Sequence, residues 1–167
     1  MTLNFMLASR AGVFLSGDFA LTTPTRVEVD FECQKLVPAI RSHWSALIAF
    51  AGVAKTSNSL DVGDWVSKNV SLIPIDAPIK TLMDTLIAAN DWLAQLGGDR
   101  RLAFSIVGFA GRKPFVAIIS NFLDLSGHMT QSPNSVLQIY FERPKFATVP
   151  VAGLVQGVQN SEHVYLE

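Results

Sequence analysis

A threonine close to the start of the chain has the chemistry of a nucleophile that carries its own base. Thr2 directly follows Met1, and Asp18 lies sixteen positions beyond Thr2, after a short apolar run. A threonine hydroxyl is a weak nucleophile until a base takes its proton. Removal of Met1 would free the α-amino group of Thr2, which titrates near neutral pH and would supply that base on the same residue. With Met1 attached, the Thr2 nitrogen is an amide and cannot accept the proton.

The elements that must position these residues are predicted as strands, then two helices, then strands. Apolar runs at 3–9 and 12–16, with Gly12 at the turn, predict an antiparallel hairpin. The segments "KLVPAI" (35–40) and "SALIAFAG" (45–52) are continuously apolar, which is typical of strands covered on both faces. Further strands are predicted over residues 101–110, 114–122, 135–142 and 146–153.

Two helices are predicted between these sets of strands, near residues 56–70 and 78–96. The first opens with capping residues and places apolar side chains at helical spacing. Pro78 suits the first turn of the second helix, and Gly97 ends it. Two stacked sheets with both helices on one outer layer would bury all of these apolar runs.

This order of residues and elements resembles the proteasome β-subunit branch of the N-terminal nucleophile hydrolases, including their simpler bacterial relatives. Members begin with threonine, pass through a strand and a Gly-Val hairpin, and reach an aspartate sixteen positions later; here "GVFLSGD" ends at Asp18. Lys35 and Leu36 match a Lys-aliphatic pair that opens a later strand, if the intervening loop is one residue longer. The segment "LIAFAGVA" matches an aliphatic strand that closes on a glycine, Gly52. The resemblance covers about residues 2–153.

The resemblance implies an α+β fold of four layers, an αββα sandwich, and hydrolysis of a peptide or amide bond without a cofactor. It makes Thr2 both nucleophile and base. Lys35 would favour the neutral amine by like-charge repulsion, and Asp18 would hold that lysine in place. The backbone N–H of Gly52 would stabilise the oxyanion of the tetrahedral intermediate.

The same residues also have ordinary structural interpretations. Asp18 follows Gly17 and suits a turn, Lys35 suits a solvated charge at a strand end, and Gly52 suits a turn. Ala20 stands where the family often has an arginine, and Glu167 ends the chain where the family's second helical block would only be starting. Both departures favour an alternative function, an inactive proteasome-like subunit with a structural or assembly role. A third interpretation is a non-enzymatic binding domain with an unrelated α+β fold.

The composition limits the partners of the chain. We expect a single domain over residues 1–167. Apolar types make up 49% of it and charged types 16%, which predicts a large core or a surface covered in a homo-oligomer, as a ring or a dimer. Lys plus Arg (13) and Asp plus Glu (14) nearly balance, so neither nucleic acid nor an anionic membrane is an expected partner.

The longest apolar runs are about half of the ~20 residues that span a bilayer. One cysteine, Cys33, fits a reducing cytoplasm.

Overall fold

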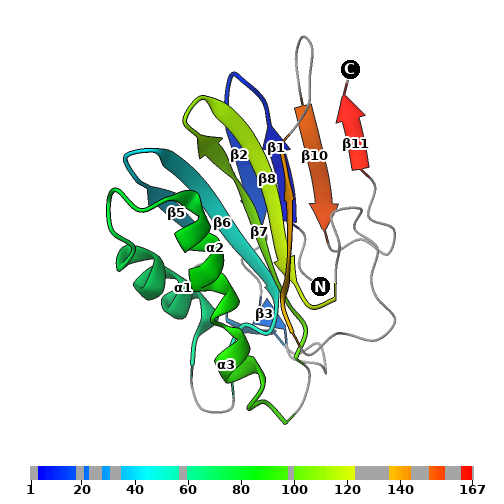
Figure 1. Ribbon diagram of the computed structural model, residues 1–167. Helices are drawn as coiled ribbons and strands as arrows, with labels where there is room; N and C mark the ends of the chain where they lie inside the picture. Colours follow the sequence, from blue (N-terminus) through cyan, green and yellow to red (C-terminus); the bar gives the residue numbers. More distant parts are fainter. Residues whose placement is uncertain are drawn as a thin grey trace.

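The chain forms a mixed α+β structure in which two antiparallel sheets face each other (Figure 1). This computed structural model describes residues 4–17, 21–22, 28–30, 35–56, 60–97, 100–122, 136–143, 151–156 and 163–166. One sheet has four strands in the order β11-β10-β1-β2, namely His163–Leu166, Val151–Gln156, Asn4–Ala8 and Val13–Gly17. The other has five in the order β5-β6-β7-β8-β9, namely Leu36–Ile40, Trp44–Gly52, Leu102–Ala110, Lys113–Ser120 and Gln138–Glu142. A small pair consists of β3 (Leu21–Thr22) and β4 (Glu28–Asp30).

The predicted N-terminal hairpin is confirmed. β1 and β2 pair antiparallel, with Asn4 opposite Gly17 and Ala8 opposite Val13. The Ser9 side chain closes the turn, because its hydroxyl donates to the Gly12 carbonyl at 3.0 Å and accepts from the Gly12 N–H at 3.1 Å. The turn chemistry and the alternating burial of β2 together hold this register.

Strand β6 is apolar without interruption because both of its faces pack against a core. Ala46, Ile48 and Phe50 belong to the core between this sheet and the helices. The residues between them, Leu47 and Ala49, contact the second core, which lies between the two sheets. Because successive strand residues face opposite sides, a strand covered on both faces must be apolar throughout.

Both predicted helices exist and cover the same face of the five-stranded sheet (Figure 1), but their limits differ from those predicted. α1 spans Val62–Ser71 and begins later than residue 56, because Asp61 caps it by accepting the Asp64 N–H at 3.2 Å. The second helix divides into α2 (Ile79–Ile87) and α3 (Asn90–Leu93). At the break the Ala89 N–H bonds to the carbonyl of Leu86, three residues back.

The described residues therefore form three layers, with helices, the five-stranded sheet and the four-stranded sheet in that order. Met6, Ala8 and Leu15 fill the space between the sheets. Their neighbours in β1 and β2 point outward, where the rings of Phe5 and Phe14 lie 6.1 Å apart. None of the described helices covers this outer face, which would be the place of the fourth layer.

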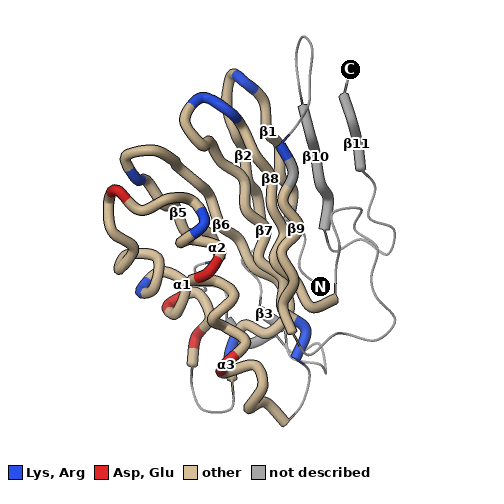
Figure 2. The backbone as a smooth tube through the Cα atoms, viewed as in Figure 1, with Lys and Arg blue, Asp and Glu red and all other residues tan. Residues whose placement is uncertain are grey.

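Charged residues gather at the turns and on the helical layer, and the described strands carry few of them (Figure 2). None of the described helices is long and apolar enough to cross a bilayer. The hairpin between β5 and β6 is tied to the helical layer by Arg41, whose Nε donates to the Ile73 carbonyl at 2.9 Å. The Trp44 indole N–H donates to the Ala77 carbonyl at 2.7 Å, which anchors the same hairpin to the segment before α2.

Candidate functional site

Two of the four candidate site residues lie at one end of the five-stranded sheet. Lys35 directly precedes β5, and Gly52 is the last residue of β6. The two strands are antiparallel neighbours in which Leu36 pairs with Ala49. The beginning of β5 and the end of β6 therefore meet, although seventeen positions separate Lys35 from Gly52 in the sequence.

Lys35 is buried, with 2% of its surface exposed. No other Lys, Arg, Asp or Glu among the residues with described burial is buried to this degree. This contradicts the interpretation of Lys35 as a solvated charge at a strand end. Moving an ammonium group out of water is costly, so a fold that buries one gives it a specific environment.

Gly52 must be glycine for two independent reasons. Its φ of +96° is a conformation that residues with a Cβ avoid. A Cβ placed on Gly52 would also lie 2.0 Å from the carbonyl oxygen of Arg101. The neighbouring Val53 N–H donates to that same oxygen at 2.8 Å. Gly52 is thus held against the start of β7 by backbone contacts.

The antiparallel pairing also determines where the N–H of Gly52 points. Neighbouring residues of a strand direct their N–H groups to opposite sides within the sheet. Gly52 pairs in register with Leu102, whose N–H and carbonyl both bond to Asn121 on the β8 side. The Gly52–Leu102 pair is therefore a non-hydrogen-bonded one, and the Gly52 N–H points away from β7, toward the side on which β5 lies. Gly52 as a residue is exposed.

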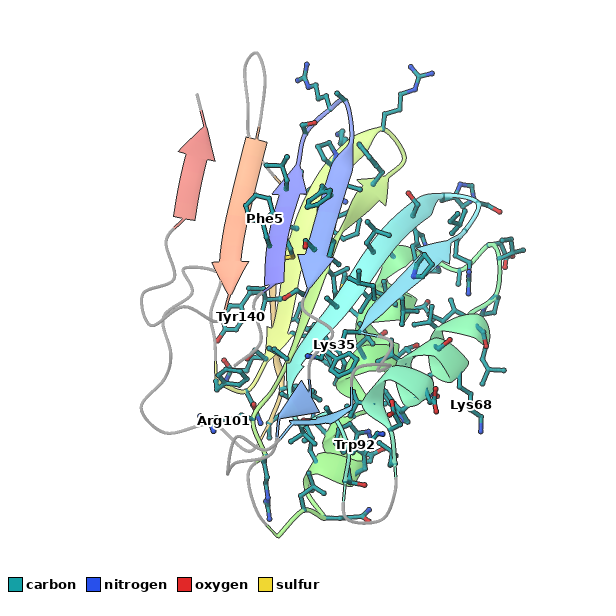
Figure 3. The ribbon with its side chains drawn as sticks, turned by 180° about the vertical axis from the view of Figure 1, so that it is seen from behind. Phe5, Lys35, Lys68, Trp92, Arg101 and Tyr140 are labelled. Atoms are coloured by element: carbon teal, nitrogen blue, oxygen red, sulfur yellow. The ribbon has the colours of Figure 1, made fainter. Side chains whose placement is uncertain are left out.

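Thr2 and Asp18 lie outside the described residues, as do Ala20 and Cys33. The described residues nearest to Thr2 and Asp18 in the sequence are Asn4 and Gly17, which pair with each other at one end of the hairpin. β2 packs on β6 and β7. Seen from behind, β2 and the cyan β6 both run toward the part of the molecule where Lys35 is labelled (Figure 3).

Sequence reasoning missed one polar residue beside this site, Asn121. The apolar pattern predicts a strand over 114–122, but β8 ends at Ser120 and the buried Asn121 side chain bonds to the backbone. The Asn121 Nδ2 donates to the Arg100 carbonyl at 2.6 Å, and its Oδ1 accepts the Leu102 N–H at 3.0 Å. A polar amide directly after a long apolar run is the signal in the sequence that could have indicated this role.

The described part of the chain places a buried lysine, Lys35, and an exposed glycine, Gly52, at a shared sheet end. Within the described ranges, no group of three or more His, Cys, Asp or Glu side chains could hold a metal ion. Residues of these types suit acyl transfer, in which a lysine can favour the neutral form of a nearby amine base and a backbone N–H can stabilise a developing oxyanion. We find no protein-family model, no curated protein and no solved structure that matches this chain.

Proposed function

We propose that this protein is a proteasome-like N-terminal threonine hydrolase that cleaves peptide or amide bonds. The observation that carries the proposal is the burial of Lys35 at the sheet end where β6 finishes with Gly52. An ammonium group kept out of water influences a nearby amine more strongly than a solvated one, because the surrounding dielectric is low. The partner amine in this proposal is the α-amino group of Thr2 after removal of Met1.

The proposed reaction begins with attack of the Thr2 hydroxyl oxygen on the carbonyl carbon of the substrate. The α-amino group of Thr2 accepts the hydroxyl proton, and Lys35 favours the neutral form of that amine beforehand. The Gly52 N–H donates to the oxyanion of the tetrahedral intermediate. The amine then returns its proton to the leaving nitrogen, and water hydrolyses the resulting threonine ester by the same steps.

The architecture is compatible with the αββα fold of N-terminal nucleophile hydrolases, and we propose that fold for this chain. Three of its layers correspond to the helices, the five-stranded sheet and the four-stranded sheet. The proposed fold has helices against the outer face of the four-stranded sheet, where Phe14 is 52% exposed. We further propose that the protein acts as a homo-oligomer, which would cover such apolar surface.

One observation favours the second candidate, an inactive subunit with a structural or assembly role. Leu36 contacts the core between the sheets, whereas Val37 and Ala39 contact the core under the helices. If the alternation of β5 continues one residue back, the Lys35 side chain points to the helical side, away from the β1–β2 hairpin. In that case Lys35 would not reach Thr2.

An electrophilic peptide probe that captures an N-terminal threonine distinguishes the two candidates. Intact mass first establishes that Met1 is absent. An active enzyme gains the mass of one probe, and Thr2→Ala abolishes this gain. Lys35→Ala should slow capture by a factor of about 100 or more, since the amine loses its neighbouring charge.

Lys68→Ala is the matched control, because Lys68 is an exposed lysine in the last turn of α1 and is labelled at the outer surface in Figure 3. Its capture rate should equal that of the unmodified protein. If Met1 is removed and neither capture nor hydrolysis of small peptide amides occurs, the hydrolase proposal is wrong and the inactive subunit takes its place.

A further inference from the structure

We infer that Asn121 is a positioning residue, which fixes the backbone N–H of Gly52 through the segment Arg100–Leu102. Asn121 follows β8 directly and is 2% exposed. It has no place in the reaction described above. The catalytic consequence of this inference rests on the proposed function, whereas the geometry rests on contacts between described residues.

The side chain of Asn121 holds both neighbours of Arg101. Its Nδ2 donates to the Arg100 carbonyl at 2.6 Å, and its Oδ1 accepts the Leu102 N–H at 3.0 Å. The Asn121 backbone N–H also donates to the Leu102 carbonyl, at 3.3 Å. A buried amide with both of its polar groups engaged fixes the backbone that it contacts, because breaking either bond leaves a polar group unsatisfied.

The carbonyl oxygen of Arg101 transmits this constraint to Gly52. It accepts the Val53 N–H at 2.8 Å, and it would lie 2.0 Å from a Cβ on Gly52. Gly52 also pairs in register with Leu102. A shift of the Arg100–Leu102 segment must therefore move the backbone of Gly52, whose N–H is the proposed oxyanion donor.

The expected effect on catalysis concerns the transition state. An oxyanion donor acts at about 2.7–3.1 Å from the oxyanion, and complete loss of one donor lowers kcat by a factor of about 100 to 1,000. Loss of Asn121 displaces the donor and does not remove it, so we expect a decrease in kcat of about tenfold. KM should change less than about threefold, because the interaction is made in the transition state.

The experiment compares Asn121→Ser and Asn121→Asp in the full chain with Met1 removed. Aspartate at this position keeps the acceptor for the Leu102 N–H but replaces the donor to Arg100 with an oxygen that repels the carbonyl. The matched control is Asn90→Ser, since the Asn90 Oδ1 accepts the Leu137 N–H at 2.9 Å, in a different part of the fold. Four quantities are measured: the melting temperature, kcat and KM for a small peptide amide, and the amide resonance of Gly52 in a ¹⁵N–¹H spectrum.

A positioning role predicts that both Asn121 variants shift the Gly52 resonance and lower kcat, each compared at a temperature where the protein is folded. Asn90→Ser should lose stability without either effect. If Asn121→Asp folds and leaves both kcat and the Gly52 resonance unchanged, the inference is overturned. If the unmodified protein does not hydrolyse the amide, the proposed function fails, and the Gly52 resonance alone decides whether Asn121 controls this backbone.

Discussion

Replacing Gly52 with alanine tests the constraint on the proposed oxyanion donor. The substitution adds one methyl group at a residue that is exposed, so it buries no new polar group and removes no side-chain contact. Two costs remain. One is the φ of +96°, and the other is the 2.0 Å separation between the new Cβ and the Arg101 carbonyl oxygen.

The magnitude follows from these two costs. A positive φ costs a residue with a Cβ about 1–2 kcal/mol. The free-energy cost of relieving a close contact with the backbone is comparable to that of overpacking a core, about 1–3 kcal/mol. Gly52→Ala should therefore lower the free energy of unfolding by about 2–5 kcal/mol, or the melting temperature by about 4–20 °C for a chain of this length.

Alanine substitutions at three other glycines measure the backbone cost and the contact cost separately. Gly111 has a φ of +62°, and a Cβ placed on it would meet nothing within 4 Å, so Gly111→Ala should lose about 1–2 kcal/mol. Gly108 has no such φ, but a Cβ there would lie 2.0 Å from the Ser45 carbonyl oxygen, so Gly108→Ala measures the contact cost alone. Gly12 has neither feature, and Gly12→Ala should be nearly neutral.

Urea denaturation of the four variants gives the four free energies of unfolding, with the urea m-value as a check on two-state behaviour. The loss for Gly52→Ala should approach the sum of the losses for Gly111→Ala and Gly108→Ala. A loss no larger than that of Gly111→Ala would show that the Arg101 carbonyl moves freely away from Gly52. That result would refute both the steric reasoning and the transmission step from Asn121.

Three further predictions concern stability. Arg41→Met removes the donor to the Ile73 carbonyl and should lower the free energy of unfolding in urea by about 1–3 kcal/mol. Asp61→Ala removes the cap of α1 and should cost about 1 kcal/mol; an unchanged urea midpoint would show that the cap contributes nothing. Lys80→Ala breaks an exposed pair with Asp84 and should change the free energy by less than about 0.5 kcal/mol, at low and high salt alike.

Local patterns predicted most of the regular elements. Continuous apolar runs indicated strands with both faces covered, and β6 has one core on each face. The hairpin of β1 and β2 followed from two short runs around a glycine turn. The helix limits were less accurate, because the position of the Asp61 cap and the break at Ala89 depend on single hydrogen bonds that the apolar periodicity does not report.

The properties of the candidate site were not predictable from the same patterns. A lysine at the start of an apolar run is usually solvated, and only the packing of the folded chain shows that Lys35 is buried. The glycine at position 52 was identified by its place at the end of a run. Its necessity comes from its positive φ and from the Arg101 carbonyl, which is 49 positions away in the sequence.

The sequence by itself determined the order of strands and helices and the residue types at the proposed site, because periodicity and turn chemistry are local properties of the chain. Only the tertiary structure decided that the start of β5 and the end of β6 meet beside the start of β7. It also decided that Asn121 holds the backbone against which Gly52 rests. Such contacts depend on sheet register between segments distant in sequence, and register is set by the packing of the whole sheet and not by any one strand.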